Sequence, residues 1–219
     1  MKNLILISGT MGVGKTSTSL ILKEKLNNSI FLDGDWCWDM NPFIVNNETK
    51  SMVLDNISYM LSNFLKVSHI ENIIFCWVMD EEEIINDILE RIENKNYKLY
   101  KFSLIANKEA LTKRINLDRE KGFRKFEDIE RSIQRIEKYK NINTIKIEVS
   151  NLTKEEVTNK IIEKIKESEE INMNIKEEVF KCEICGSEMI KNEYAYDNNQ
   201  YGKVYYKCNE CGHKMNIIK

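Results

Sequence analysis

The residues whose types and spacing most directly suggest chemistry lie between Gly9 and Thr16 and read G-T-M-G-V-G-K-T. This segment matches the pattern G-x-x-x-x-G-K-[ST], in which a glycine-rich backbone turns its amides toward phosphate oxygens. In that pattern Lys15 reaches the outer phosphates of a nucleotide, and the hydroxyl of Thr16 binds Mg²⁺. We therefore expect ATP, in preference to GTP, to contact the whole segment: Gly9, Thr10, Met11, Gly12, Val13, Gly14, Lys15 and Thr16.

The sequence on either side of this segment supports the same interpretation. The apolar run Leu4 to Ile7 predicts a buried strand before it, and a helical pattern from Lys15 to about Leu26 follows it. A strand, a glycine-rich loop and a helix in this order form the P-loop motif, in which the helix N-terminus adds unpaired amides to the anion site. The alternative is a glycine-rich turn that binds nothing, which the complete pattern disfavours.

Two acids follow the next predicted strand. Ser29 to Leu32 predicts a short buried strand, and Asp33-Gly34-Asp35 comes directly after it. The acids therefore lie at the carboxyl edge of the sheet, where open α/β folds bind ligands. Alternatively, the acids form only a polar turn that caps the strand, because Asp-Gly is a common turn pair.

This position resembles the same place in small P-loop kinases such as gluconate kinases, adenylylsulfate kinases and polynucleotide kinases, where one acid orients or deprotonates the acceptor hydroxyl. The resemblance implies that Asp35 is the catalytic base and that Asp33 faces Mg²⁺ together with Thr16. Lys15 would hold the transferred phosphate during the reaction.

Aromatic residues follow the predicted base directly. Trp36 and Trp38 bracket a single residue, Cys37. They could form the wall of a pocket that stacks a ring, or they could belong to an ordinary core strand, and the pattern favours neither.

The apolar run Ile73 to Val78 predicts a central buried strand. In many P-loop proteins the equivalent strand ends in an Asp that supports the water shell of Mg²⁺. Here the nearest acid is Asp80, which we expect to be the N-cap of the next helix. Trp77 and Met79 would instead face the cleft as apolar surface, so Thr16 and Asp33 are the predicted metal-binding residues.

A basic cluster surrounds Gly122 between two predicted helices and comprises Arg114, Arg119, Lys121, Arg124 and Lys125. A basic, glycine-containing loop at this point resembles the LID of nucleotide kinases, whose arginines neutralise charge on the transferred phosphate. The resemblance implies that Arg119 and Arg124 are catalytic and that Arg114 supports nucleotide binding from its helix. The alternative is a solvated surface, which we accept for the two lysines.

The order of the predicted elements defines the fold class. Helical patterns separate five predicted strands, which lie at residues 4–7, 29–32, 73–78, 97–105 and 144–149. This alternation predicts an α/β fold, a three-layer, doubly wound domain with a parallel five-stranded sheet. Over residues 1–166 the chain resembles the nucleotide-kinase-like branch of P-loop proteins, which contains small-molecule and nucleotide kinases, and AAA-type ATP-binding domains are expected among its relatives.

The C-terminal part contains two C-x-x-C-G segments separated by twenty-two residues, with the thiols at Cys182, Cys185, Cys208 and Cys211. Four thiolates at this spacing predict one structural, tetrahedral Zn²⁺ in a zinc ribbon, because four protein ligands close the metal shell. The predicted domains are a kinase-like domain at residues 1–166, a linker and helix end at 167–180 and the zinc ribbon at 181–219.

Composition agrees with a globular protein: 42% of the residues are hydrophobic and 31% are charged, and the formal net charge is only −2. No apolar run approaches the length of a membrane span or of a secretory signal, so we expect a cytoplasmic protein with no membrane partner. Metal binding by four of the six cysteines fits that reducing compartment.

These features lead to one main functional hypothesis and two alternatives. The main hypothesis is a kinase that transfers the γ-phosphate of ATP to a hydroxyl or phosphate of a small molecule or nucleotide. The first alternative is a polynucleotide 5′-hydroxyl kinase whose zinc ribbon holds nucleic acid, and the second is an ATP-binding adaptor that transfers nothing. Nucleic-acid binding would use tyrosines of the ribbon to stack on bases: Tyr194, Tyr196, Tyr201, Tyr205 and Tyr206.

Overall fold

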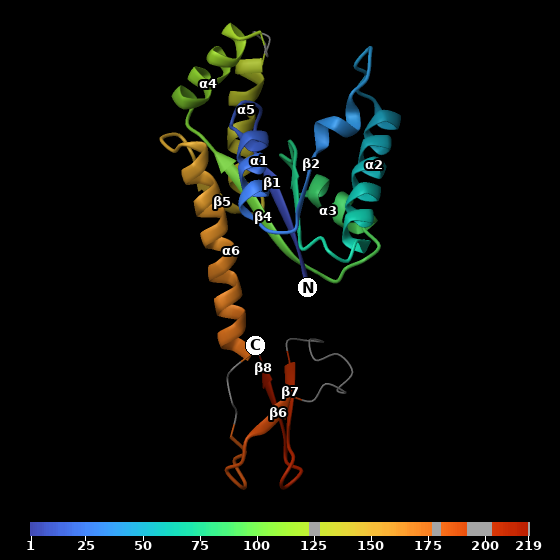
Figure 1. Cartoon of the computed structure of the whole chain (residues 1–219), viewed down its shortest axis with the longest axis vertical. Coiled ribbons are helices and arrows are strands. Elements are labelled where there is room, and N and C mark those ends of the chain that lie inside the picture. Colours follow the sequence, from blue (N-terminus) through green and yellow to red (C-terminus); the bar gives the residue numbers. More distant parts are fainter. Residues whose placement is uncertain (123–127, 177–180, 192–202, 219) are drawn as a thin grey trace. The chain divides into compact units, whose positions relative to one another are not determined.

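The computed structural model of the chain describes residues 1–122, 128–176, 181–191 and 203–218. Contacts divide the chain into two compact units, Met1–Ile165 and Lys166–Lys219. Figure 1 shows the parallel sheet with its helices in the first unit and a small separate sheet in the second.

The first unit is built on five parallel strands. Their order in the sheet is β2-β3-β1-β4-β5, so the strand before the glycine-rich loop lies at the centre. The strands are β1 (Lys2–Ser8), β2 (Ser29–Asp33), β3 (Asn72–Cys76), β4 (Tyr97–Ile105) and β5 (Ile145–Glu148). The predicted α/β class with a five-stranded parallel sheet is confirmed.

Helices cover both faces of this sheet (Figure 1). They are α1 (Lys15–Lys25), α2 (Asn47–Lys66), α3 (Glu82–Arg91), α4 (Lys108–Glu120), α5 (Asp128–Asn141) and α6 (Lys154–Lys176). The central strand shows how the layers form, because its side chains alternate between faces. Ile5 and Ile7 pack in the cluster that contains residues of α1, α4 and α6, whereas Leu4 and Leu6 pack with α2 and α3.

Local sequence signals set where several helices begin. Asn46 and Thr49 form a reciprocal capping box at α2, and Thr153 and Glu156 form another at α6. The expectation for Asp80 is wrong, because the N-cap of α3 is Glu81, which makes no side-chain cap hydrogen bond.

The second unit has its own three-stranded antiparallel sheet, in the order β6-β7-β8. The strands are β6 (Met189–Lys191), β7 (Lys203–Cys208) and β8 (Lys214–Ile218). Among the residues of this unit that the structure describes, the buried apolar cluster consists of Cys182, Met189 and Cys208, with Tyr206 and Met215 packed against them. Such a small apolar cluster cannot by itself stabilise a domain of this size.

Among the described helices of the chain, none combines the length and the apolar character needed to cross a membrane.

Candidate functional site

The glycine-rich loop connects β1 to α1 and leaves the helix start open to an anion. Gly14 is the N-cap of α1, so no side chain caps the helix, and the first turn contains no acid. Unpaired amides and the positive end of the helix dipole therefore point at the space in front of the loop. Lys15 extends along the same loop, and its Nζ donates to the carbonyl of Thr10 at 3.2 Å. The loop thus presents the donors that a nucleotide phosphate requires.

Gly12, a variable position of the motif, is fixed by tertiary packing. It adopts a φ of +78°, and a Cβ built there would lie 2.5 Å from Cγ1 of Ile115 in α4. Both the backbone conformation and the close contact exclude a larger residue. The sequence motif does not require glycine at this position, and only the approach of α4 to the loop explains it.

A second helix also reaches the loop. Thr10 is buried, and its Oγ1 donates to the backbone carbonyl of Ser132 in α5 at 2.9 Å. The loop is therefore braced from α4 through Ile115 and from α5 through Ser132.

Asp33 is the acid closest to the loop, with only 5% of its surface exposed. Its Oδ2 accepts from Oγ1 of Thr16 at 2.7 Å, and its Oδ1 accepts from the backbone amide of Asp35 at 3.1 Å. Asp33 therefore caps the following turn, as the turn interpretation expects, and it also contacts the motif threonine, whereas its predicted role at Mg²⁺ stays a prediction. A hydroxyl and a carboxylate oxygen side by side are hard donors of the kind that Mg²⁺ prefers.

A thiol occupies the end of β3, where many P-loop proteins have an acid. Sγ of Cys76 lies 3.4 Å from Oδ2 of Asp33. Burial, with a further contribution from the charge of Asp33, raises the pKa of Cys76 to about 12, so the thiol stays protonated and neutral at neutral pH. It therefore adds no negative charge beside Asp33.

Asp35 lies in a short 3-10 helix, η1 (Gly34–Trp38), so the interpretation of the tryptophans as a core strand is wrong. Its side chain is exposed, and its Oδ1 accepts a hydrogen bond of 3.1 Å from Nε1 of Trp77. Gly34 makes this contact sterically feasible, because a Cβ there would lie 2.4 Å from Cγ of Trp77. Gly34, directly after β2, and Trp77, directly after β3, therefore both contribute to the position of Asp35.

The two tryptophans of η1 have different neighbours. Trp38 lies against Trp77, with ring centroids 6.2 Å apart, and against Phe43 at 5.3 Å. Trp36 instead contacts Phe31 of β2, edge to face at 5.3 Å. Only Trp38 therefore shares an aromatic group with the tryptophan that contacts Asp35.

Two expectations for the residues after β3 fail. Met79 is fully buried in the core under α2 and α3, so it does not present apolar surface to a cleft. Asp80 is also buried, and its Oδ2 lies 3.4 Å from Nε of Arg135 and 3.6 Å from Nζ of Lys138, both in α5. Burial, together with the charge of Asp80, raises the pKa of Tyr139 in the same helix. Asp80 thus anchors α5 to the sheet.

The arginines of the basic cluster are separated by the structure. Arg114 in α4 donates to the carbonyl of Val13 at 3.0 Å and to the carbonyl of Val149 at 2.5 Å, so it joins the glycine-rich loop to the end of β5. Burial lowers the pKa of this guanidinium, which the charge of Glu148 partly opposes. Arg119 lies in the last turn of α4 and donates to Oδ1 of Asn116 at 3.1 Å. Arg124, with Lys125, lies outside the described residues.

A cavity of about 500 Å³ adjoins the loop where Arg114 lies. The residues that line it come from the loop, from α1, from α4 and from the segment between β5 and α6, and they include Gly12, Val13, Ser17, Arg114, Val149 and Leu152. A volume of a few hundred Å³ is typical of small-ligand sites, and the lining combines apolar side chains with four charged ones, Arg114, Asp118, Lys154 and Glu155. Its position beside the phosphate-binding amides fits the base end of a nucleotide.

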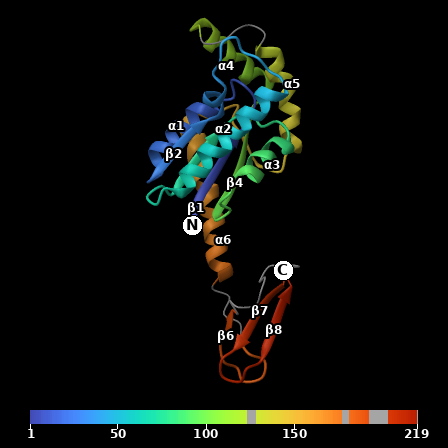
Figure 2. The same cartoon turned by 90° about the vertical axis from the view of Figure 1, so that its right-hand side faces the viewer.

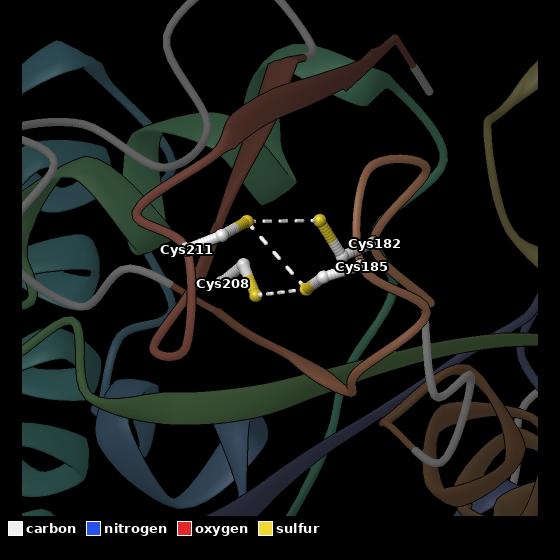
Figure 3. Close-up of side chains that lie close together, drawn as sticks. All are labelled: Cys182, Cys185, Cys208 and Cys211. Atoms are coloured by element: carbon white, nitrogen blue, oxygen red, sulfur yellow. Dashed lines mark hydrogen bonds between the residues drawn. The ribbon is translucent and has the colours of Figure 1, made fainter.

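The four cysteines of the second unit converge on one point. Figure 3 shows their side chains pointing toward one another, with sulfur–sulfur distances of 3.4 to 3.5 Å for three pairs and all four sulfurs within 4.8 Å of one another. In a tetrahedral zinc site with bonds of about 2.3 Å the sulfurs lie roughly 3.8 Å apart. The donor set and its spacing therefore fit one Zn²⁺.

The backbone repeats the same turn around both cysteine pairs. The amide of Gly186 donates to the carbonyl of Cys182, and the amide of Gly212 donates to the carbonyl of Cys208, each at 2.9 Å. The two glycines have φ values of +74° and +75°, which a residue with a side chain adopts only with strain. Two equivalent knuckles thus present two thiols each to the same point.

The tyrosines expected to stack on bases lie largely outside this description. The side chains of Tyr194, Tyr196, Tyr201 and Tyr205 are not among those described, and Tyr206 is half-buried against the cluster of Cys182, Met189 and Cys208.

Comparison with solved structures supports the fold. A gluconokinase from Sinorhizobium meliloti 1021 superposes with a TM-score of 0.60 at 14% identity and covers 80% of this chain and 97% of that one. The tunicamycin resistance protein of Deinococcus radiodurans gives 0.57 at 17%, covering 75% and 96%. A chain of an RNA repair complex gives 0.53 at 15%, covering 64% and 45%. At these identities the similarity establishes the fold alone.

Comparison with curated protein sequences gives no match. A family defined as an AAA domain matches residues 5–137, which is more than half of the chain and includes the glycine-rich loop and most of α5. This match agrees with the ATP-binding motif read from the sequence and with the sheet order described above. The chain belongs to the AAA domain family.

Proposed function

We propose that this protein is an ATP-dependent phosphotransferase that moves the γ-phosphate of ATP to a hydroxyl group of a small acceptor. The observation that carries the proposal is the position of Asp33, whose two carboxylate oxygens contact Thr16 of the phosphate loop and the backbone of Asp35. Through Asp33, the exposed acid Asp35 lies close to the phosphate loop. A nucleotide-binding switch needs an acid beside the loop only for Mg²⁺, which Asp33 would hold, whereas phosphoryl transfer to a hydroxyl also uses an acceptor for the hydroxyl proton, which Asp35 would provide.

The phosphate loop would hold ATP through its amides and Lys15, with the base of the nucleotide in the cavity beside Arg114. Thr16 and Asp33 would hold Mg²⁺, because they are the hard oxygen donors next to the loop. When bound, this ion neutralises charge on the phosphates. Because Cys76 adds no charge at neutral pH, Asp33 is the acid available there among the residues around Thr16 that we describe.

Asp35 would accept the proton of the acceptor hydroxyl late in the transfer. Its carboxylate is exposed to an incoming molecule, and the hydrogen bond from Trp77 restricts its orientation. Arg119 and Arg124 remain proposed to close over the phosphates, where a guanidinium would stabilise charge on the transferred group.

Zinc would have a structural role in the second unit. Four thiolates complete a tetrahedral shell and leave no position for a substrate, so the metal would stabilise the small sheet instead of catalysing a reaction.

The test compares ATP binding with phosphoryl transfer in three variants. Lys15→Ala should weaken ATP binding, measured by calorimetry. Asp35→Asn should leave ATP binding unchanged and abolish transfer of labelled phosphate to acceptors in a panel of nucleosides, sugars and alcohols. Asp39→Asn removes a nearby exposed acid at the end of η1 and should change neither property. Full transfer by the Asp35→Asn variant would reject the assigned base, and absence of any transfer by the wild type would favour the adaptor hypothesis.

A further inference from the structure

A continuous row of aromatic rings leads away from Asp35. Trp77 donates to Oδ1 of Asp35, its ring lies 6.2 Å from that of Trp38, and the Trp38 ring lies 5.3 Å from that of Phe43. We call Trp77, Trp38 and Phe43 the aromatic row. The three residues come from the ends of β3 and η1 and from the segment before α2, so the fold brings them together from separate parts of the sequence.

The outer end of the row is exposed. Phe43 has 64% of its surface accessible, and its neighbours Ile44 and Val45 are also exposed, as is Met52 in α2. Single exposed apolar residues are ordinary, but a contiguous group beside a polar site indicates a binding surface. Figures 1 and 2 both place the segment before α2 at the same end of the sheet as α4 and α5. This apolar group therefore borders the end of the unit at which the phosphate loop also lies.

The segment that contributes Trp38 and Phe43 to the row is acidic. Between Asp33 and Lys66 the chain has no arginine, two lysines and five acids, which are Asp33, Asp35, Asp39, Glu48 and Asp55. Lys66 lies 3.3 Å from Glu93 in an ion pair, and Lys50 is exposed in the first turn of α2. Arg91 of α3 pairs with Asp55. Sites that bind phosphate or carboxylate groups use unpaired arginines or several lysines, and this segment provides no such group.

We propose that the acceptor is an uncharged or cationic hydroxyl compound with a flat apolar ring, which lies against Trp38 and Phe43 and directs its hydroxyl toward Asp35. This inference rests on the proposed phosphotransferase function and narrows its acceptor to molecules without a phosphate or carboxylate group. In the reaction the hydroxyl oxygen forms a bond to the γ-phosphorus, the bond from that phosphorus to the bridging oxygen of ADP breaks, and the proton passes to Asp35.

Matched pairs of probes test the charge and the ring separately. Uridine is compared with uridine monophosphate, and phenyl glucoside is compared with glucose and with gluconate. Binding is measured as the rise in melting temperature of the full chain in the presence of a non-hydrolysable ATP analogue. Transfer is measured with labelled ATP. Uridine and phenyl glucoside should bind. Transfer to each of them should exceed transfer to its anionic counterpart, or to glucose, which has no aromatic ring, by at least about tenfold in kcat/KM.

Variants on the surface test the row itself. Phe43→Ala removes an exposed ring and should raise the KM for uridine or phenyl glucoside roughly tenfold while ATP affinity stays unchanged. Tyr59→Ala, which removes a ring that is 70% exposed on α2, is the matched control and should have no effect. Val45→Arg adds a cation beside the row and should improve the use of uridine monophosphate over uridine.

The outcomes separate this inference from the proposed function. Wild-type preference for uridine monophosphate or gluconate would overturn the inference and leave the phosphotransferase proposal intact. Binding of the uncharged probes that depends on Phe43, without any transfer, would support the inference and count against the phosphotransferase. If none of the uncharged ring-bearing probes binds, or if Tyr59→Ala weakens binding as much as Phe43→Ala, the row is not the acceptor surface.

Discussion

The indole nitrogen of Trp77 donates a hydrogen bond of 3.1 Å to Oδ1 of Asp35, and this contact joins the segment after β3 to the short helix after β2. Asp35 is exposed, and this contact helps to restrict the direction of its carboxylate. Trp77 in turn packs against Trp38 of the aromatic row, and its ring fits beside η1 because Gly34 has no side chain.

Replacing Trp77 by Phe keeps an apolar ring and removes the donor. We expect kcat to fall roughly tenfold, because a hydrogen bond to a charged group contributes about 1.5–3 kcal/mol. The affinity for ATP should stay the same, since Trp77 does not contact the phosphate loop through any described hydrogen bond. Trp36→Phe is the control, because Trp36 contacts Phe31 and not Asp35. Equal losses in both variants would show that the hydrogen bond has no specific role.

Replacing Gly12 by Ala should separate the phosphate loop from α4. The new methyl group meets Ile115, and the φ of +78° adds backbone strain, so we expect a loss of about 2–4 kcal/mol in the free energy of unfolding. Urea denaturation measures this loss. Gly14→Ala is the comparison, because its φ is +108° but no atom lies within 4 Å of the added Cβ. Ile115→Ala removes the clashing Cγ1 and should therefore cost less stability in the Gly12→Ala background than in the wild type, and equal costs in the two backgrounds would contradict the assigned clash.

Replacing Asp80 by Asn should loosen α5. The buried carboxylate faces Arg135 and Lys138, and its loss leaves those cations facing a neutral group, which we expect to cost about 1–2 kcal/mol because both cations can still reach water. Thermal denaturation and hydrogen exchange of the amides in α5 measure the effect. Glu81→Gln removes an exposed partner of Lys138 and should have a smaller effect. Similar effects of the two changes would argue against an anchoring role for Asp80.

Replacing Cys208 by Ser should release zinc from the second unit. Zinc content of the purified chain, measured by mass spectrometry, should fall from about one ion per chain to well below that value, because three thiolates bind the metal less tightly than four. Limited proteolysis should then cut within residues 181–218 and spare the first unit. Cys37→Ser should retain the metal, since Cys37 is not part of the four-cysteine cluster. Full zinc content in the Cys208 variant would contradict the assigned ligand set.

Much of the architecture was readable from the sequence because the signals are local. The phosphate loop is a continuous segment, and its function depends on backbone geometry that glycines at fixed spacing permit. The strands of the sheet are short apolar runs, and several helices begin with capping residues that act within one turn, as Thr153 and Glu156 do. The cysteine pairs are likewise visible, because each knuckle closes on itself through one glycine.

The details of the candidate site depend on contacts between distant parts of the chain. Periodicity could not show whether Trp36 and Trp38 extend a strand, because the chain turns into η1 where Gly34 packs against Trp77, which follows more than forty residues later. Asp80 has the local appearance of a helix cap, but α5, which begins almost fifty residues later, covers it and supplies its cations.

The sequence by itself therefore determined that this protein has a parallel α/β sheet, a phosphate loop and a four-cysteine cluster, since the signal for each lies in short segments: apolar runs alternating with helical patterns, the glycine-rich motif and the two C-x-x-C-G pairs. Only the tertiary structure decided that Trp77 fixes Asp35, that Ile115 requires glycine at position 12 and that Phe43 extends the aromatic row. These relations arise from the packing of separate elements across the sheet, and the spacing of residues along one segment contains no information about which distant side chain will lie against it.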